Sequence, residues 1–446
     1  MSIQAYPEQM RQALEGKTIL VIGTSNSGSR LIWDIFTAVK LKVILVAHTV
    51  YSDEPNKVHS LLWYNYSNQS DIDSHANNII QLLGDRHIDG CFTFTEEDTP
   101  ITAVICQKLG LRGFHPDAAM TVRSKHNTYQ ILRQNTTDCL YITEKYSPIS
   151  YRIGTVRDIS DAKKITYPAV LKPEFDAGSW GVVKVTSEDD CLSQINRLQR
   201  SFDTSRLGGK FGKSLVLMEL LQGLSYNVDV VIYDGELMIG LITDVGLYLP
   251  NMFVDTATCQ PSSLSDELQT DLTTAAHQCC CKVGLVNGVF NTEWKITESG
   301  PKLVEINGRI GMYRRSIVYK TTHGVILWEI AAAIACGIKP SFPDISVRSF
   351  AVGAYLYTKF HREQFLKKEV IQTLKSLANA KVILLEMFEL KDLKQNEEEF
   401  PLSFCHLVAL SNKDIKHARQ SLLDLYRSLG FAETEYNIER FTSLWA

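Results

Sequence analysis

The sequence lacks a long hydrophobic run. Residues 1–17 are polar and contain no apolar core of signal-peptide length, and no later stretch is apolar for long enough to span a bilayer. We therefore expect a cytoplasmic protein without a membrane partner.

An excess of charge of one sign is also missing. Lys and Arg total 46 against 50 Asp and Glu, which gives a formal net charge of -4. This balance provides no basic footprint of the kind that binds nucleic acid or an anionic membrane surface. We expect no nucleic-acid partner.

Cysteine motifs are absent although the chain has 10 cysteines. The cysteines are scattered and form neither a disulfide framework nor a Cys-x-x-Cys metal knuckle, which indicates reduced thiols. Cys279, Cys280 and Cys281 are adjacent and would point in different directions on a helix. We interpret them as small buried residues, and a metal or redox site is the alternative.

The chain is long enough for two or three packed units, since it has 446 residues. Apolar strands are expected at 17–22, 42–47 and 90–94, and helical patterns separate them. This alternation is typical of a parallel sheet, so residues 1–118 are expected to form a Rossmann-like α/β domain.

The remainder of the chain has a different, α+β pattern. After a helix expected at about 117–134, strands with glycine turns continue to about 307, and a further α/β segment follows. No internal repeat or low-complexity segment is present. We predict a multidomain α/β and α+β protein with boundaries at 1–118, 119–205, 206–345 and 346–446.

A first glycine loop, GTSNSGSR at 23–30, follows the first strand. It matches neither the dinucleotide nor the P-loop fingerprint, and Ala47 and His48 end the second strand where a ribose-binding carboxylate would stand. We interpret the loop as a tight strand-to-helix turn. Binding of a substrate carboxylate at the helix N-terminus stays open.

A second glycine loop joins two expected strands, YPAVLKP at 167–173 and the end of DAGSWGVVKV at 176–185. Gly178 and Gly181 would let backbone N–H groups approach phosphate oxygens, Ser179 adds a hydroxyl, and Lys172 adds a positive charge. Phosphate binding and an ordinary exposed hairpin are both compatible with this pattern.

The segment GVFNTEWKIT at 288–297 predicts a hairpin with PKLVEINGR at 301–309, joined by the three-residue turn 298–300. In this register Glu293 lies opposite Glu305, and alternation places Asn291 and Asn307 on the same face as both glutamates. Two like charges in one place favour a cation between them, and oxygen ligands on rigid strands suit Mg²⁺, with Mn²⁺ as an alternative ion. A solvated polar face is the other interpretation, and the pairing of Glu with Glu disfavours it.

At these residues the chain resembles the ATP-grasp superfamily, and within it carnosine synthase and the bacterial L-amino-acid ligases. The resemblance is specific over about 218–340, and it includes FVDTATCQP at 253–261 and AAAIACGIKP at 331–340. Weaker similarity extends from FTFTEED at 92–98 through RSKHNTYQILR at 123–133.

The resemblance implies a fold, a reaction and roles for particular residues. It implies an ATP-grasp fold with an N-terminal pre-ATP-grasp domain, a nucleotide-binding lid, a central catalytic part and a C-terminal segment closing the cleft. It also implies ATP and Mg²⁺ as cofactors and the joining of a carboxylate to an amine on small amino-acid or carboxylate substrates. The residues implied are Lys125, Lys172 and 176–181 at the phosphates, Glu219 and Leu221 at the adenine and ribose, Glu293, Glu305 and Asn307 at the metal, Arg309 at the transition state, and Asp255 or Glu97 at the substrate amine.

Several positions depart from the family pattern. Met218 stands where an acid is usual, Ser225 replaces a common Glu, and Met312 replaces a glycine after Arg309. The Met312 change suggests a different acceptor or acyl substrate. Ligation onto a peptide or protein end, carboxylation, and a non-catalytic nucleotide-binding protein remain alternatives, and both a monomer and a homodimer stay open.

Overall fold

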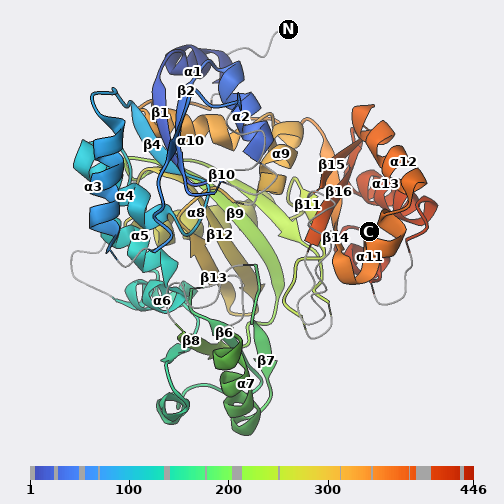
Figure 1. The fold of residues 1–446 in the computed structure, drawn as a ribbon. Coiled ribbons are helices and arrows are strands. Elements are labelled where there is room, and N and C mark those ends of the chain that lie inside the picture. The colour runs from blue at the N-terminus through green and yellow to red at the C-terminus, as the bar shows by residue number, and fades with distance from the viewer. Residues whose placement is uncertain are drawn as a thin grey trace.

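The residues that the structure describes form three β-sheets (Figure 1). The structure is a computed structural model. It describes residues 6–24, 29–49, 56–68, 71–134, 141–175, 178–202, 213–249, 252–311, 313–342, 345–380, 382–387, 403–431 and 436–446.

The first sheet is parallel and N-terminal. Its strands are ordered β3-β2-β1-β4, with bounds Thr18–Ile22 for β1, Lys42–Ala47 for β2, Ser60–Trp63 for β3 and Gly90–Thr93 for β4. Helices alternate with the strands: α2 (Ser29–Ala38), α3 (Ile72–Leu83) and α4 (Thr99–Leu109). The apolar strands are buried on both faces, as is typical of parallel sheets. The predicted α/β arrangement is confirmed.

The second sheet is a small antiparallel unit that projects from the body of the molecule (Figure 1). Its order is β5-β8-β6-β7, with bounds Ser150–Ile153 for β5, Ala169–Pro173 for β6, Val183–Val185 for β7 and Leu215–Glu219 for β8. Helix α7 (Glu188–Ser201) packs against β6 and β7. The predicted hairpin around the second glycine loop is present, since β6 pairs with β7.

The third sheet is antiparallel, has eight strands and forms the centre of the molecule. Its order is β13-β12-β9-β10-β11-β14-β16-β15. The strands are β9 (Leu224–Tyr233), β10 (Glu236–Val245), β11 (Ala257–Gln260), β12 (Gly288–Thr297), β13 (Gly300–Asn307), β14 (Phe350–Tyr357), β15 (Ile383–Met387) and β16 (Ser403–Ser411). Because β14 pairs with β11, this sheet continues across the boundary expected at residue 345.

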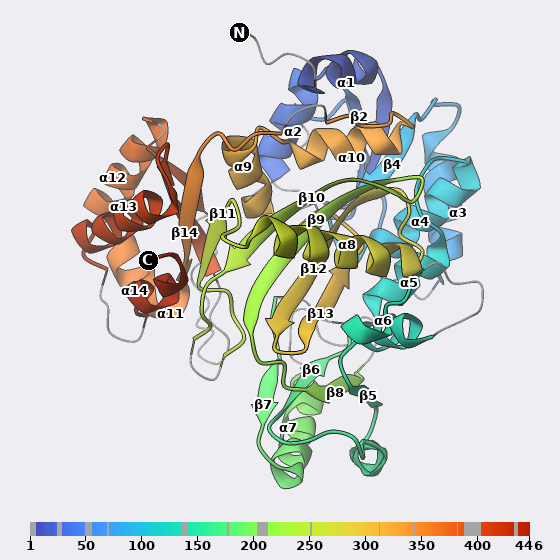
Figure 2. The same ribbon diagram turned by 180° about the vertical axis from the view of Figure 1, so that it is seen from behind.

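Helices cover the central sheet from both faces (Figure 2). Helix α8 (Asp266–Lys282) packs on β9 and β10, where Val228, Val230 and Ile232 point toward it. Alternation sends Val231 to the other face, where it packs with helix α10 (Leu327–Ala335). Cys279 and Cys280 belong to α8 and are buried in the core between this helix and the sheet, as interpreted from the sequence. Cys281, the third residue of the run, is only partly buried.

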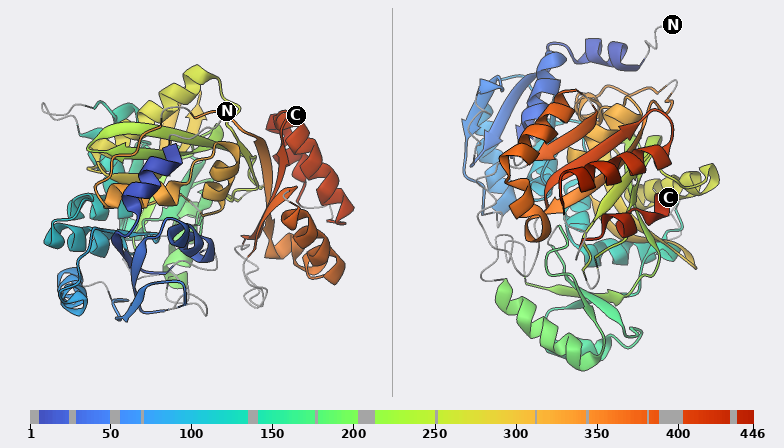
Figure 3. Two further views of the ribbon diagram at one scale, coloured as in Figure 1. Left: turned by 90° about the horizontal axis from the view of Figure 1, so that it is seen from above. Right: turned by 90° about the vertical axis from the view of Figure 1, so that its right-hand side faces the viewer.

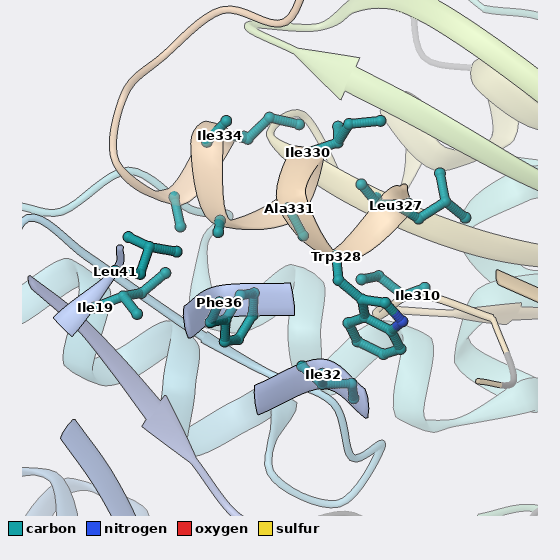
Figure 4. Packing of buried hydrophobic residues seen from close by; sticks show 14 of the residues in the cluster. Ile19, Ile32, Phe36, Leu41, Ile310, Leu327, Trp328, Ile330, Ala331 and Ile334 are labelled. Atoms are coloured by element: carbon teal, nitrogen blue, oxygen red, sulfur yellow. The ribbon is translucent and has the colours of Figure 1, made fainter. Parts of the chain in front are cut away.

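Helix α10 lies between the N-terminal sheet and the central sheet. Figure 4 shows Trp328 of this helix pointing toward Ile32 of α2, while Ile330 lies on the opposite side of the helix. Nearly every residue of α10 is buried, because it has protein on both sides. Helix α1 (Tyr6–Leu14) packs on α10 as well. One hydrophobic core therefore joins the two sheets.

The C-terminal helices pack on the far end of the central sheet (Figure 3). They are α11 (Thr358–Phe365), α12 (Lys368–Asn379), α13 (Ile415–Ser428) and α14 (Ile438–Phe441). The acidic segment around 396–399 lies outside the described residues.

Two local predictions are wrong. The helix expected at 117–134 is two helices, α5 (Pro116–Arg123) and α6 (Lys125–Arg133), because Ser124 is extended and its side chain caps α6 by accepting from the Asn127 N–H. The hairpin turn has two residues instead of three, since Thr297 pairs directly with Gly300.

Candidate active site on the central sheet

The hairpin of β12 and β13 brings the predicted metal ligands together. Glu293 lies opposite Glu305, and Asn291 lies opposite Asn307, as the alternation predicted. A β-bulge follows, because Trp294 pairs with Leu303 and leaves Val304 as the extra residue on β13. Bulges often redirect groups beside functional sites, and the sequence pattern did not indicate this one.

The two glutamates are unequally neutralised. Lys125 Nζ lies 2.9 Å from Glu305 Oε1. Burial, the neighbouring Glu305 and then Asp255 raise the pKa of Glu293 to about 7, against the opposing charges of Arg315 and Lys125. A divalent cation placed between the carboxylates would remove this repulsion.

The donor set fits Mg²⁺ that also binds nucleotide phosphates. Glu293, Glu305 and Asn307 offer two carboxylates and an amide, all hard oxygen donors. Across the described residues, no group of three or more His, Cys, Asp or Glu side chains could hold a metal ion. A metal at these residues would therefore need further oxygen ligands from nucleotide or water.

Lys172, which was predicted to bring a positive charge to the phosphates, is buried. The side chain is 3% exposed, and Nζ donates to the Tyr129 hydroxyl at 3.0 Å and to the Val304 carbonyl at 3.3 Å. Burial lowers the pKa of Lys172, and Glu305 and Glu293 oppose this effect. The bulge at Val304 thus supplies a carbonyl that holds the ammonium beside the glutamate pair.

The second glycine loop has an unusual backbone. Gly178, Ser179 and Gly181 have φ of 68°, 61° and 68°, in the left-handed region. A Cβ at Gly181 would lie 2.9 Å from Pro173 Cγ, so this turn requires glycine for space as well as for φ. Residues 176 and 177 of the predicted phosphate loop lie outside the described residues.

The residues predicted for adenine and ribose lie next to an apolar cluster. Met218 and Leu221 are buried there together with Val170, and Phe253 and Val304 pack against them. The apolar surface accounts for Met218 where the family usually has an acid. The Glu219 side chain instead accepts from the Ile149 N–H at 2.8 Å, which ties β8 to the start of β5.

Arg309 is held by Glu96. Its Nε lies 3.1 Å from Glu96 Oε2, and its Nη2 donates to Asn307 Oδ1 at 3.3 Å. Glu96 is 7% exposed, and its pKa is raised by burial despite the nearby Arg309 and Arg123. The residue that the sequence analysis named for the substrate amine is the neighbouring Glu97, which is only partly buried. The geometry therefore favours Glu96 as the acidic partner at this end of the site.

Asp255 is a further carboxylate near Glu293, since its charge contributes to the raised pKa of that glutamate. Burial raises the pKa of Asp255, and Arg315 and Lys295 oppose the increase. Its backbone carbonyl accepts from the Tyr357 hydroxyl of the C-terminal part of the sheet. Ser225, the second departure from the family, lies in the same region and donates to the Tyr248 hydroxyl at 2.9 Å.

The sequence analysis missed several residues that complete this site. Asp229 on β9 lies opposite Asn291, and Asn227 lies opposite Glu293. A signal for both existed, since Ser225, Asn227 and Asp229 are polar residues at a spacing of two in a strand that is mainly apolar. Arg315 is 3% exposed and donates to Asn291 Oδ1 at 3.2 Å. Met312 lies outside the described residues.

Residues 165–315 match the family model described as ATP-grasp domain. They include the second glycine loop, the residues predicted for adenine and ribose, and the hairpin of β12 and β13. Over this stretch the chain is similar to ATP-grasp domains. The match covers β6, β7 and β8 of the second sheet, β5-β8-β6-β7, which is called the lid sheet below after the predicted nucleotide-binding lid. It also covers both strands that carry the candidate metal ligands, β12 and β13. The predicted ATP-grasp fold is thereby confirmed.

Curated relatives extend the likeness over most of the chain. Carnosine synthase 1 of Homo sapiens is 28% identical over 442 residues, which is 97% of this chain and 53% of the relative. Alanine--anticapsin ligase of Bacillus subtilis is 23% identical over 291 residues, covering 62% of this chain and 60% of the relative. The chain thus spans about half the length of the carnosine synthases that it matches.

Solved structures agree on the fold. The L-amino acid ligase from Bacillus licheniformis superposes with a TM-score of 0.72 at 18% identity, covering 93% of this chain and 97% of that chain. An ADP complex of N5-carboxyaminoimidazole ribonucleotide synthetase gives a TM-score of 0.67 at 14% identity, over 94% and 97% of the two chains. In the described ranges, no helix is both long and apolar enough to cross a membrane.

Proposed function

We propose that the chain is an ATP-dependent ligase that joins the carboxylate of one amino acid, or amino-acid-like molecule, to the amine of another. The reaction would proceed through an acyl phosphate and release ADP and phosphate. The observation that carries the proposal is the pair Glu293 and Glu305, flanked by the buried cations Lys125 and Lys172 on one side and Arg309 on the other.

In this proposal the nucleotide lies between the lid sheet and the hairpin. The base would contact the apolar cluster of Val170, Met218 and Leu221. Gly178, Ser179 and Gly181 would present backbone N–H groups and a hydroxyl to the phosphates. Lys125 and Lys172 would neutralise phosphate charge, and Lys172 is already fixed by Tyr129.

Glu293, Glu305 and the Asn307 oxygen would hold Mg²⁺ or Mn²⁺. The ion would supply charge neutralisation for the phosphate oxygens. The chain's own part is to hold both glutamates close together, and Lys125 offsets part of their mutual repulsion by pairing with Glu305.

The substrates would lie on the Arg309 and Asp255 side. A substrate carboxylate oxygen attacks the γ-phosphorus of ATP, and ADP leaves. The amine of the second substrate then attacks the carbonyl carbon, phosphate leaves, and the nitrogen loses a proton to solvent. Arg309, oriented by Glu96, would stabilise the charge that develops on the carbonyl oxygen, and Asp255 would bind a substrate ammonium.

The named relatives support this choice of reaction. They include carnosine synthase 1, alanine--anticapsin ligase and, by structure, an L-amino acid ligase. A ligase of small amino-acid substrates accommodates all three names. The buried and partly buried charges of both signs around Glu293 also suit a zwitterionic substrate better than an uncharged one.

The test is a panel of paired amino acids incubated with ATP and Mg²⁺, with phosphate release and product mass measured together. We expect at least one pair to give an amide product with one phosphate released for each bond formed. An arm with bicarbonate and an arm with short peptides separate carboxylation and peptide extension. Phosphate release with no amide product in any arm would contradict the proposal, and Asp255→Asn should raise the KM for the accepted amine.

A further inference from the structure

A chain of hydrogen bonds runs beneath the candidate metal site. Asn307 Nδ2 donates to Asn291 Oδ1 at 3.3 Å, and Arg315 Nη2 donates to the same oxygen at 3.2 Å. On the far side, Arg309 Nη2 donates to Asn307 Oδ1 at 3.3 Å. Asn291 is completely buried, at 0% exposure. Its side chain therefore reaches the candidate metal site through Asn307. Its other neighbours are Arg315 and, on β9, Asp229.

The two arginines determine which way both amides point. A guanidinium has only donors, so the Asn291 atom that faces Arg315 must be the oxygen. That oxygen then requires the amide nitrogen of Asn307 on its side. The oxygen of Asn307 must consequently point away from Asn291, toward Arg309 and the side where Glu305 lies.

Arg315 is itself fixed by its surroundings. It lies in α9 (Tyr313–Thr322), and burial disfavours its charge, but the carboxylates of Asp229, Glu293 and Asp255 raise its pKa overall. Asp229 is fully buried and accepts from the Gly311 N–H at 3.0 Å. A Cβ at Gly311 would lie 2.5 Å from Asp229 Oδ1 and 3.1 Å from Asn291 Nδ2. The network is thus tightly packed and has one arrangement of donors and acceptors.

We propose that Asn291, oriented by Arg315, is a positioning residue that presents the Asn307 oxygen to the divalent cation. The inference rests on the proposed function for the existence of the metal site. Asn291 touches neither nucleotide nor substrate and acts by preventing rotation of the Asn307 amide. Groups that orient metal ligands typically change metal affinity or activity by 10- to 100-fold when they are removed.

The experiment measures metal binding without turnover. Mn²⁺ binding to the full chain in the presence of ADP is titrated by electron paramagnetic resonance, and ADP binding is measured separately in EDTA. Asn291→Leu keeps the volume but removes the acceptor, so we expect the half-saturating Mn²⁺ concentration to rise by about 10- to 100-fold while ADP binding in EDTA is unchanged. Asn291→Asp keeps an acceptor oxygen toward both neighbours, so Mn²⁺ binding should stay within about threefold of wild type.

The matched control is Asn287→Leu. Asn287 lies just before β12, and its side chain accepts from Arg112 at 3.2 Å and from the Asp234 N–H at 2.9 Å, so it is tied into the structure without facing the metal ligands. Its variant should bind Mn²⁺ with ADP like wild type. If Asn291→Leu does not fold, Asn291→Ser takes its place, since a serine side chain is too short to reach Asn307.

Each outcome bears on a specific claim. Wild-type Mn²⁺ binding in Asn291→Leu, or equal losses in Asn291→Leu and Asn291→Asp, would overturn the positioning role. A wild-type protein that takes up no Mn²⁺ with ADP would contradict both this role and the proposed function. Normal Mn²⁺ uptake with no ligation product would contradict only the proposed reaction.

Discussion

At the scale of single residues, the site is a set of charges that balance only in part. Glu293 and Glu305 face each other, and Lys125 forms an ion pair with Glu305. The raised pKa of Glu293, about 7, reflects burial and this shortage of positive charge. Ligand sites commonly hold such residual charge, because the ligand completes the balance.

We predict that Glu293→Ala and Glu305→Ala each abolish Mg²⁺-dependent ATP turnover while the fold is kept, because each removes one anionic oxygen ligand. Turnover would be followed by phosphate release over a Mg²⁺ titration, and folding by circular dichroism. Glu298→Ala, on the exposed hairpin turn, is the control and should behave like wild type. Normal turnover in both site variants would refute the metal assignment.

Lys172→Ala should weaken ATP binding and reduce turnover by orders of magnitude, because the variant loses a preorganised cation beside the phosphates. Nucleotide affinity would be measured by calorimetry. Lys184→Ala is a matched control, since Lys184 lies on the same hairpin and is exposed. Equal ATP affinity in the Lys172 variant and the control would show that the phosphates bind elsewhere.

Arg309→Lys should bind ATP with near-normal affinity but form product far more slowly. The lysine keeps the charge but cannot reproduce the planar fork that contacts Glu96 and Asn307 together. The kcat for product formation would be compared with the dissociation constant of ATP. A variant that loses ATP affinity yet keeps its turnover at saturating ATP would assign Arg309 to nucleotide binding instead.

At the scale of elements, interruptions of regular structure position the site. Ser124 separates α5 from α6, and its hydroxyl donates to Glu174 directly after β6. The Lys125 N–H donates to the Glu174 carbonyl at 3.3 Å, so the start of α6 is tied to the lid sheet. The bulge at Val304 has a similar effect on β13, because its carbonyl accepts from Lys172. Both irregularities hold a lysine against the glutamate pair.

The C-terminal helices contain a buried histidine that should make them sensitive to acid. His361 is 1% exposed, its Nδ1 accepts from the Tyr357 N–H at 2.9 Å, and its Nε2 lies 2.7 Å from the Tyr426 hydroxyl. Burial lowers the pKa of His361 to about 3, against the contribution of the Tyr357 backbone. Between this value and the ordinary pKa of 6.5, the unfolded chain binds a proton that the folded chain does not.

The buried neutral imidazole of His361 therefore makes its full contribution to the free energy of unfolding above pH 6.5, and this contribution is lost as the pH falls below that value. We predict a decrease of up to about 1.4 kcal/mol in the free energy of unfolding per pH unit below 6, from this residue alone. Melting of wild type and His361→Asn at several values between pH 7 and pH 5 would check it, and the variant should have the shallower pH dependence. His417→Asn, at an exposed position, should keep the wild-type slope, and identical slopes in all three proteins would contradict the prediction.

At the scale of the whole molecule, α10 connects the N-terminal sheet with the central sheet. It lies in the core that both sheets share (Figure 4). Helix α1 is anchored to it by an ion pair. Arg11 Nε and Nη2 donate to the two oxygens of Glu329 at 2.9 and 2.8 Å, and Glu329 is 2% exposed. The position of Glu96 relative to Arg309 depends on this packing, since Glu96 follows the N-terminal strand β4.

We predict that Arg11→Ala lowers the free energy of unfolding by about 1 to 3 kcal/mol, because it leaves a buried carboxylate without its bidentate partner. Lys40→Ala, which breaks the exposed pair between Lys40 and Glu15, should change it by less than about 0.5 kcal/mol. Denaturant unfolding of the three proteins would compare them. An equal effect of both substitutions would mean that the Arg11 pair does not anchor α1.

The sequence predicted which polar side chains of β12 and β13 share a face because β-strand alternation is strictly local. The period of two fixes which side chains share a face, so the alternation of Asn291 with Glu293 and of Glu305 with Asn307 followed from the letters alone. The predicted register, with Glu293 opposite Glu305, is correct because the bulge at Val304 offsets a turn that is one residue shorter than predicted. The parallel N-terminal sheet followed in the same way, from apolar runs alternating with helical patterns. The ATP-grasp resemblance rested on these same residues.

Tertiary structure alone decided the partners of these residues. Glu96 meets Arg309 because the N-terminal sheet packs against the central one, and this contact could not be predicted from either segment alone. Arg315 meets Asn291 because α9, which packs on β11 and β14, brings this side chain to β12. The bulge at Val304 arises from pairing that no local pattern encodes. The sequence by itself therefore determined the fold class and the groups presented by each strand. The orientation and charge balance of those groups depend on contacts between segments far apart in the chain, which periodicity cannot specify.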